Sequence, residues 1–154
     1  MAPQQHARHA DGGAGDSTEL RRVPFLEHLG IVIEHTEPGR ATASLDPRPE
    51  HLNTWGAVHG GVVMTLLDVA MALAGRSYDP VNLSGVTVDM STSFISPGRG
   101  KQLAEGRVVA RSSTLWRCEA EVRNASDGAL VGRAIGTFKF KNLANTSRHP
   151  VGDA

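Results

Sequence analysis

Residues 60–76 of the chain read GGVVMTLLDVAMALAGR, an apolar run with almost no polar face. Such a run predicts a helix that is buried on most sides, because its apolar side chains point in nearly every direction around the axis. A sheet therefore has to curl around the helix, with or without a second subunit. Two polar residues, Thr65 and Asp68, interrupt the run and are candidates for a special role.

The segments on either side of this helix have the patterns of strands. The predicted strands are 30–35, 41–45, 86–94, 102–111, 116–122 and 130–140. Two strands precede the helix and four follow it, without the regular alternation of strand and helix that builds a parallel sheet. This order indicates an α+β fold with an antiparallel sheet, in which the last four strands are expected to pair in hairpin series.

The whole chain has 154 residues, which suits one domain. Residues 1–18 and 144–154 lack apolar periodicity and are expected to be disordered tails around a domain at 19–143. The sixteen basic residues are balanced by sixteen acidic residues, which argues against a nucleic-acid partner. The single cysteine, Cys118, excludes an intrachain disulfide and a thiolate metal cluster.

The chain also lacks the features of membrane and secreted proteins. No apolar segment reaches the roughly 20 residues that cross a bilayer. The first fifteen residues, MAPQQHARHADGGAG, have no apolar core and do not resemble a signal peptide. We therefore expect a cytoplasmic protein.

Asp68 is the strongest candidate for chemistry. A carboxylate in an apolar helix loses its hydration, and its pKa rises unless hydrogen bonds stabilise the charge. Perturbed carboxylates in clefts serve as general bases or nucleophiles. An equally open interpretation is a structural Asp that bonds a neighbouring backbone group or hydroxyl.

The start of the helix, His59-Gly60-Gly61, is a second candidate. The first N–H groups of a helix have no intrahelical acceptor and lie at the positive end of its dipole, so they can hold a developing oxyanion. For the two glycines taken alone, a tight loop leading into a buried helix is the favoured interpretation. In the preceding loop, Asn53 is typical of an Asx-turn, and Trp55 is expected either to pack or to line a pocket.

These features occur together in residues 51–75, HLNTWGAVHGGVVMTLLDVAMALAG. This run resembles the hotdog-fold acyl-CoA thioesterases of the family typified by the phenylacetate-degradation thioesterase. The shared pattern is an Asn, a Gly, a His-Gly-Gly and an Asp eight residues beyond the first Gly of that pair. The strand 85–90 and residues 136–138 are also similar, so the resemblance covers roughly residues 25–140.

The resemblance implies a fold, an assembly and a set of catalytic roles. The fold is a curled antiparallel sheet of five to six strands around one long buried helix, in a homodimer or a dimer of dimers. The Gly60 N–H, alone or with Gly61, polarises a thioester carbonyl, and Asp68 acts as general base or nucleophile. Asn53 helps to hold the carbonyl or the water, Thr87 orients the water or Asp68, and His59 shapes the loop.

The resemblance also implies an acyl-CoA substrate and no cofactor or metal, since coenzyme A is part of the substrate. Its phosphates favour basic and hydroxyl residues near the mouth of the site. The candidates for substrate binding are Gly61, Trp55, Arg111, Ser112, Ser113 and Lys139, with Arg99, Lys101 and Arg117 as further basic residues. For each cation, a solvated position on a strand is the competing interpretation.

Two other functions are compatible with the same fold. A dehydratase or hydratase would use His59 and Asp68 as a base and acid pair, although the proline-rich loop and the Asp-to-His motif of those enzymes are absent. A non-catalytic acyl-CoA-binding protein would need no buried carboxylate. An enoyl-CoA absorbance assay and an assay of thiol release separate these alternatives.

Overall fold

The computed structural model describes residues 23–142, and the two expected tails at 1–18 and 144–154 lie outside them. The elements are α1 (Pro24–Leu29), β1 (Ile31–Glu37), β2 (Arg40–Leu45), the 3₁₀ helix η2 (Pro49–His51), α2 (Gly60–Arg76), β3 (Leu83–Phe94), β4 (Gln102–Arg111), β5 (Trp116–Asn124) and β6 (Leu130–Asn142). The long helix and the six strands confirm the elements that the periodicity predicts.

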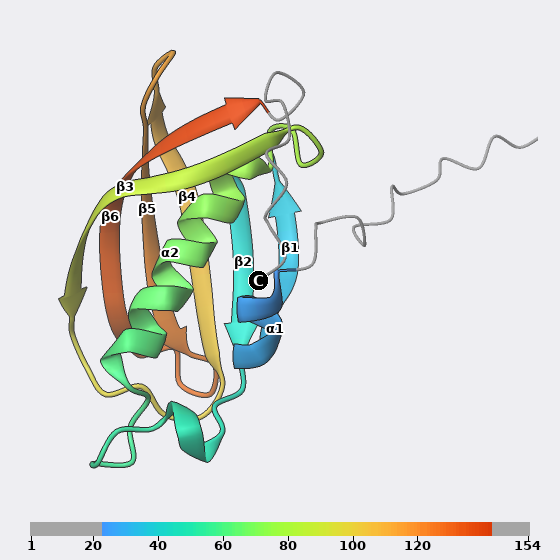
Figure 1. Cartoon of the computed structure of the whole chain (residues 1–154). Helices are drawn as coiled ribbons and strands as arrows, with labels where there is room; N and C mark the ends of the chain where they lie inside the picture. The colour runs from blue at the N-terminus through green and yellow to red at the C-terminus, as the bar shows by residue number, and fades with distance from the viewer. Residues whose placement is uncertain (1–22, 143–154) are drawn as a thin grey trace, which may run out of the picture.

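Helix α2 crosses the concave face of one curled antiparallel sheet (Figure 1). The face of the sheet that packs on the helix carries small residues. The backbones of sheet and helix approach most closely at Gly106 on β4, where a Cβ would overlap the carbonyl of Ala70. Opposite them, Val63, Leu66 and Leu67 of α2 are almost fully buried. This arrangement confirms the expected hotdog fold.

The order of the strands differs from the expected hairpin series. The sheet runs β1-β2-β4-β5-β6-β3, so β3 pairs with β6 at one edge and β4 pairs with β2. Only β4, β5 and β6 form consecutive hairpins after the helix. Alternation along a strand defines which face is apolar but not which strand lies alongside, so the sequence could not reveal the crossover after β3.

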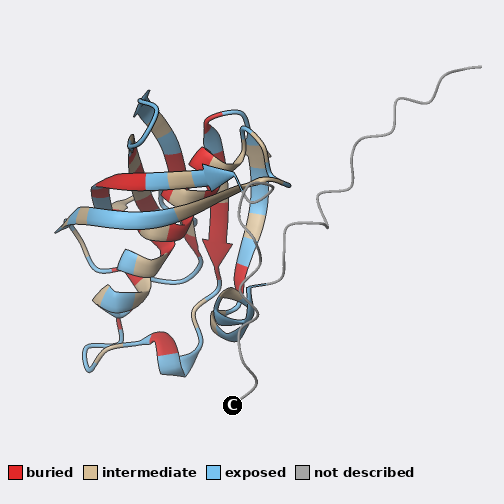
Figure 2. Cartoon of the chain, turned by 45° about the horizontal axis from the view of Figure 1, so that its top comes forward, coloured by how far each residue is buried: buried red, intermediate tan, exposed pale blue. Residues whose placement is uncertain are grey.

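The burial of α2 and β3 is also lower than the sequence predicts. A stripe of α2 at three- to four-residue spacing, containing Thr65, Asp68 and Ala72, is only half-buried. On β3, Val86 and Val88 are 60% and 57% exposed, and much of this edge strand is exposed in Figure 2. A helix and a strand that are apolar in sequence but uncovered in one chain indicate that a further surface covers them.

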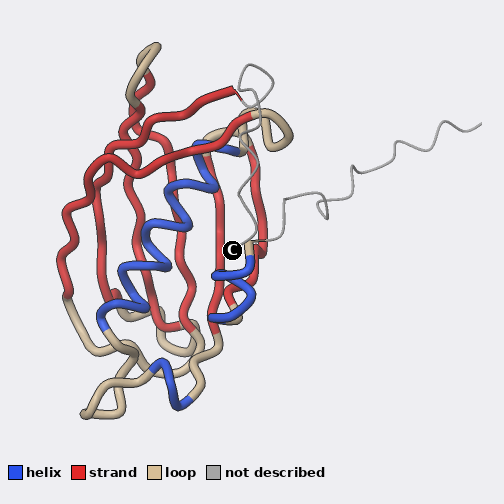
Figure 3. The backbone as a smooth tube through the Cα atoms, in the orientation of Figure 1, coloured by secondary structure: helices blue, strands red, loops and turns tan. Residues whose placement is uncertain are grey.

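The structure contains a short helix, α1, which Figure 3 shows in blue and which is not among the predicted elements. Its signals are a proline at its first position, Pro24, and a terminating glycine, Gly30, with φ of 73°. Six residues are too few to show a helical periodicity, so only the proline at the start and the glycine at the end indicate this helix in the sequence.

Candidate functional site

Asp68 and Thr87 form a hydrogen-bonded pair between α2 and β3. The Thr87 hydroxyl donates to Oδ1 of Asp68 over 2.7 Å. A β-bulge at residues 87–89 interrupts the pairing of β3 with β6, and such bulges re-aim side chains next to functional sites. Asp68 is half-buried rather than buried as the sequence predicts, so its second carboxylate oxygen is available for a water or a substrate.

A cavity of about 590 Å³ opens beside this carboxylate. Most of its walls are apolar and come from α1, α2 and β3. The main apolar lining residues are Val23, Phe25, Leu26, Met64, Val69, Ala72, Leu73 and Met90. Phe25 and Leu26 are not among the predicted site residues, because the helix α1 that carries them was not predicted. The cavity is suited to an apolar group held next to a carboxylate.

The N-terminus of α2 begins with two glycine N–H groups, of which one is paired. Nδ1 of His59 accepts a hydrogen bond from the Gly61 N–H over 3.0 Å and caps the helix. The Gly60 N–H has no acceptor among residues 23–142. Of the two N–H groups, only that of Gly60 is therefore available to an oxyanion, and His59 caps the helix.

Asn53 closes the loop before the helix. Its Oδ1 accepts hydrogen bonds from the N–H of Trp55 over 2.9 Å and of Ala57 over 3.1 Å. This is the Asx-turn geometry that its sequence context favours. Both Nδ2 protons remain without an acceptor in the described part of the chain, so the amide can still donate to a carbonyl or a water.

Gly60 and Asp68 cannot act together within one chain. They are eight residues apart on α2, which corresponds to about 12 Å along the axis. The Asp68 side chain reaches back only a few ångströms towards the N-terminus. A single carbonyl therefore cannot contact both groups of the same helix.

Of the predicted substrate-binding residues, Gly61 lines this cavity, whereas Trp55 and the basic and hydroxyl candidates for binding coenzyme A phosphates do not. Arg111 places its guanidinium over the Tyr78 ring, 4.0 Å from the centroid. Ser112 uses its hydroxyl within its own turn, donating to the Leu115 carbonyl over 2.8 Å. The turn containing Ser112 and Ser113, between β4 and β5, lies at the end of the molecule opposite to the N-terminus of α2 (Figure 1).

Two other basic candidates, Lys101 and Lys139, lie at positions that explain their charge without a substrate. Lys101 pairs with Glu34 over 3.1 Å. Lys139 is exposed on β6, opposite Val86 of β3. Neither lines the cavity beside Asp68, so their contribution to substrate binding stays a prediction.

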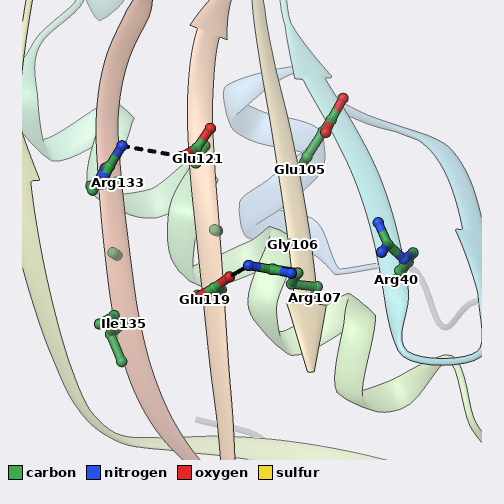
Figure 4. Close-up of a pocket in the computed structure, with 10 residues that line it drawn as sticks. Arg40, Glu105, Gly106, Arg107, Glu119, Glu121, Arg133 and Ile135 are labelled. Atoms are coloured by element: carbon green, nitrogen blue, oxygen red, sulfur yellow. Dashed lines mark ion pairs between the residues drawn. The ribbon is translucent and has the colours of Figure 1, made fainter. Parts of the chain in front are cut away.

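A second hollow of about 420 Å³ lies on the outer face of the sheet (Figure 4). Its charges largely compensate one another, with Arg107 paired to Glu119 and Arg133 paired to Glu121. Its lining residues include no hydroxyl, thiol or imidazole that could act as a nucleophile. These features do not support catalysis there.

Other kinds of site find no support in residues 23–142. No group of three or more His, Cys, Asp or Glu side chains in this part of the chain could hold a metal ion. Burial raises the pKa of the Cys118 thiol to about 11, so the thiol stays protonated at neutral pH and packs as an apolar residue. Of the helices described, none has the length and hydropathy that crossing a bilayer requires.

Replacing Thr87 by valine is expected to lower kcat/KM of the reaction at this site by at least about tenfold. Valine keeps the shape but removes the hydrogen bond to the charged carboxylate, a contribution of about 1.5–3 kcal/mol. Thr87→Ser keeps the hydroxyl and should remain within about twofold of the wild type. If Thr87→Val is silent on every substrate tested, Thr87 does not orient Asp68.

Replacing His59 by alanine is expected to lower the Tm by about 2–8 °C, because loss of an N-cap costs about 1 kcal/mol. His59→Asn supplies a new cap, so its Tm and its kcat/KM should both equal those of the wild type. Thermal unfolding and steady-state rates are compared for the two variants. Recovery of the Tm without recovery of kcat/KM would instead assign chemistry to the imidazole.

The sequence matches the family described as "Thioesterase superfamily" over residues 56–131. A mutant of the phenylacetic acid degradation protein PaaI from Thermus thermophilus is 32% identical, with 76% of this chain and 98% of that chain covered and a TM-score of 0.67. Conserved protein PA5202 from Pseudomonas aeruginosa is 27% identical, with a TM-score of 0.75 over 82% of this chain and all of that chain. Human acyl-coenzyme A thioesterase 13 is 28% identical over 124 residues, 79% of this chain and 86% of that protein.

Proposed function

The chain belongs to the thioesterase superfamily and is a thioester hydrolase, and we propose that it acts in the cytoplasm on acyl-CoA thioesters, releasing a free acid and coenzyme A. The observation that carries the proposal is the Asp68–Thr87 pair on the wall of a mostly apolar cavity. An apolar acyl group occupies the cavity, and the carboxylate lies where the thioester carbonyl would enter.

In the proposed reaction Asp68 acts as general base. Its carboxylate takes a proton from a water, and the water oxygen attacks the thioester carbonyl carbon. The Gly60 N–H stabilises the negative oxygen of the tetrahedral intermediate, and the Asn53 amide donates a second hydrogen bond to it. The carbon–sulfur bond then breaks, and protonated Asp68 returns its proton to the leaving thiolate.

This mechanism needs two copies of the chain. Since Gly60 and Asp68 of one helix cannot reach the same carbonyl, each site takes the loop and helix start from one subunit and the Asp68–Thr87 pair from the other. A two-fold dimer creates two equivalent sites of this kind. The exposed edge strand β3, with Val86 and Val88 uncovered, and the half-buried stripe of α2 support a dimer through this side.

A panel of acyl-CoA substrates tests the proposal. The purified full chain is assayed with acetyl-, hexanoyl-, decanoyl-, benzoyl- and phenylacetyl-CoA, and release of coenzyme A is followed with a thiol reagent. We expect thiol release that is faster with apolar acyl groups than with acetyl. Hydration of an enoyl-CoA without thiol release would indicate a hydratase, and tight binding without turnover would indicate a non-catalytic binder.

A further inference from the structure

The side chain of Trp55 is exposed where an indole is not expected. It is 87% exposed, more than any other large apolar side chain in residues 23–142. A tryptophan contributes about 150–250 Å² of surface when it is buried, so leaving it in water forfeits a large hydrophobic gain. The indole makes no ring contact within the described chain.

The loop that carries Trp55 is held by its own hydrogen bonds. Besides the two bonds to Oδ1 of Asn53, the Asn53 N–H donates to the Ala57 carbonyl over 2.8 Å, and Gly56 turns the chain with φ of 70°. A bridge between Leu52 and Val58 closes the base of the loop. The backbone that carries Trp55 is therefore held in place before the helix, which reduces the backbone entropy lost when the indole packs against another surface.

The proposed dimer defines where this indole lies. In each composite site the Gly60 N–H of one subunit contacts the carbonyl next to Asp68 of the partner subunit. Trp55 precedes Gly60 by five residues, which span at most about 17 Å even when fully extended. Because the bridge folds the loop back, the Cα atoms of Trp55 and Gly60 are closer together than this limit, so Trp55 borders the composite site that Gly60 forms with the partner subunit's Asp68 and the apolar cavity beside it.

We infer that Trp55 of one subunit closes the acyl cavity of its partner and thereby selects compact acyl groups over long ones. The inference rests on the proposed function, because the composite site brings the indole to that cavity. The surface that covers the exposed indole thus belongs to a second copy of this chain. Its counterparts are the apolar cavity walls that Phe25 of α1 and Met64 of α2 contribute, both themselves exposed in one chain.

The first test is a change of acyl selectivity. Trp55→Ala opens the end of the cavity, so the ratio of kcat/KM for decanoyl-CoA to that for phenylacetyl-CoA should rise at least tenfold, since a change of one methylene in a pocket alters selectivity by about 10- to 200-fold. Trp55→Phe should give an intermediate ratio. Val109→Ala removes another exposed apolar side chain, on β4, and should leave the ratio unchanged. Val109→Ala should keep the Tm of the wild type, whereas both Trp55 variants should lower the Tm of the dimer, because the inferred contact buries the indole against the partner subunit.

The second test reads the position of the indole without catalysis. The chain has two tryptophans, and Trp116→Phe leaves Trp55 as the only reporter while a ring still packs against Phe140. In this variant, acrylamide should quench the indole at least threefold less in the dimer with a non-hydrolysable thioether analogue of phenylacetyl-CoA than in dilute, dissociated protein.

Three results would overturn the inference: a monomer at assay concentrations, an indole equally quenched in the dimer with the analogue and in the dissociated protein, or one rate factor for Trp55→Ala across the whole acyl panel. Failure of the proposed function gives a different result. No thiol release by the wild type from any acyl-CoA removes the acyl-CoA hydrolase itself, and the selectivity of Trp55 is lost with it.

Discussion

Asp68→Asn is expected to lower kcat/KM by at least a hundredfold on the best acyl-CoA substrate. General-base assistance contributes about 10²- to 10⁴-fold, and an amide cannot take a proton from water at neutral pH. Asparagine has nearly the same shape, and its Oδ1 can still accept the hydrogen bond from Thr87, so the contact between α2 and β3 is retained. The measurement is thiol release under steady-state conditions, together with thermal unfolding of the same preparation.

The matched control is Glu105→Gln, which also removes one negative charge. Glu105 is exposed on the outer face of the sheet, so we expect its replacement to leave kcat/KM within about twofold of the wild type. An unchanged Tm for Asp68→Asn would assign the loss of activity to chemistry rather than to unfolding. A loss smaller than tenfold would remove Asp68 from the catalytic role and leave it as a structural partner of Thr87.

The sequence predicted the central helix and the six strands because each depends on a local pattern. The apolar run of 60–76 needs no knowledge of its neighbours to be identified as a buried helix, and residues 116–122 show their charged and apolar faces by alternation alone. The pairing of β3 with β6 depends on a crossover through residues 95–101, which has no local signature. The exposure of α2 and β3 in one chain could not be predicted either, because an apolar face indicates that some surface covers it but not whether that surface belongs to the same chain.

The candidate site divides in the same way. Asp68 stands out in the sequence as a lone carboxylate in an apolar helix. Only the family resemblance indicates its partner Thr87, and the structure shows the hydrogen bond between them, 2.7 Å long. His59 and Gly61 were both candidates at the helix start, and their mutual hydrogen bond leaves Gly60 as the available donor. The exposure of Trp55 is a tertiary property, since the same residue in the same loop could have packed against its own chain.

A mixture of two inactive variants is expected to recover about a quarter of wild-type activity if the site is shared between subunits. The first variant is Asn53→Asp, which keeps an oxygen acceptor for the N–H groups of Trp55 and Ala57 but loses both amide donors. The second is Asp68→Asn. Each homodimer has two defective sites, and both should be nearly inactive.

Refolding the two chains together in equal amounts gives about half heterodimers by random pairing. In each heterodimer one site carries both substitutions and the other site carries neither, so half of the molecules regain one of their two sites. The control mixture is Asp68→Asn with Thr87→Val, whose residues lie on the same side of the site. Every site of that heterodimer holds one substitution, and its activity should not exceed the mean of the two parents.

Recovery in the first mixture alone would mean that Asn53 and Asp68 act on one carbonyl from different chains. This follows from the helix geometry, because about 12 Å separates Gly60 from Asp68 along one axis and only a second, roughly antiparallel helix can bring the two groups together. Absence of recovery in a mixture whose heterodimers are demonstrated by mass spectrometry would show that each chain acts alone. The Gly60 N–H would then lose its role at the carbonyl that Asp68 serves, and the oxyanion would need a donor within reach of the same carboxylate.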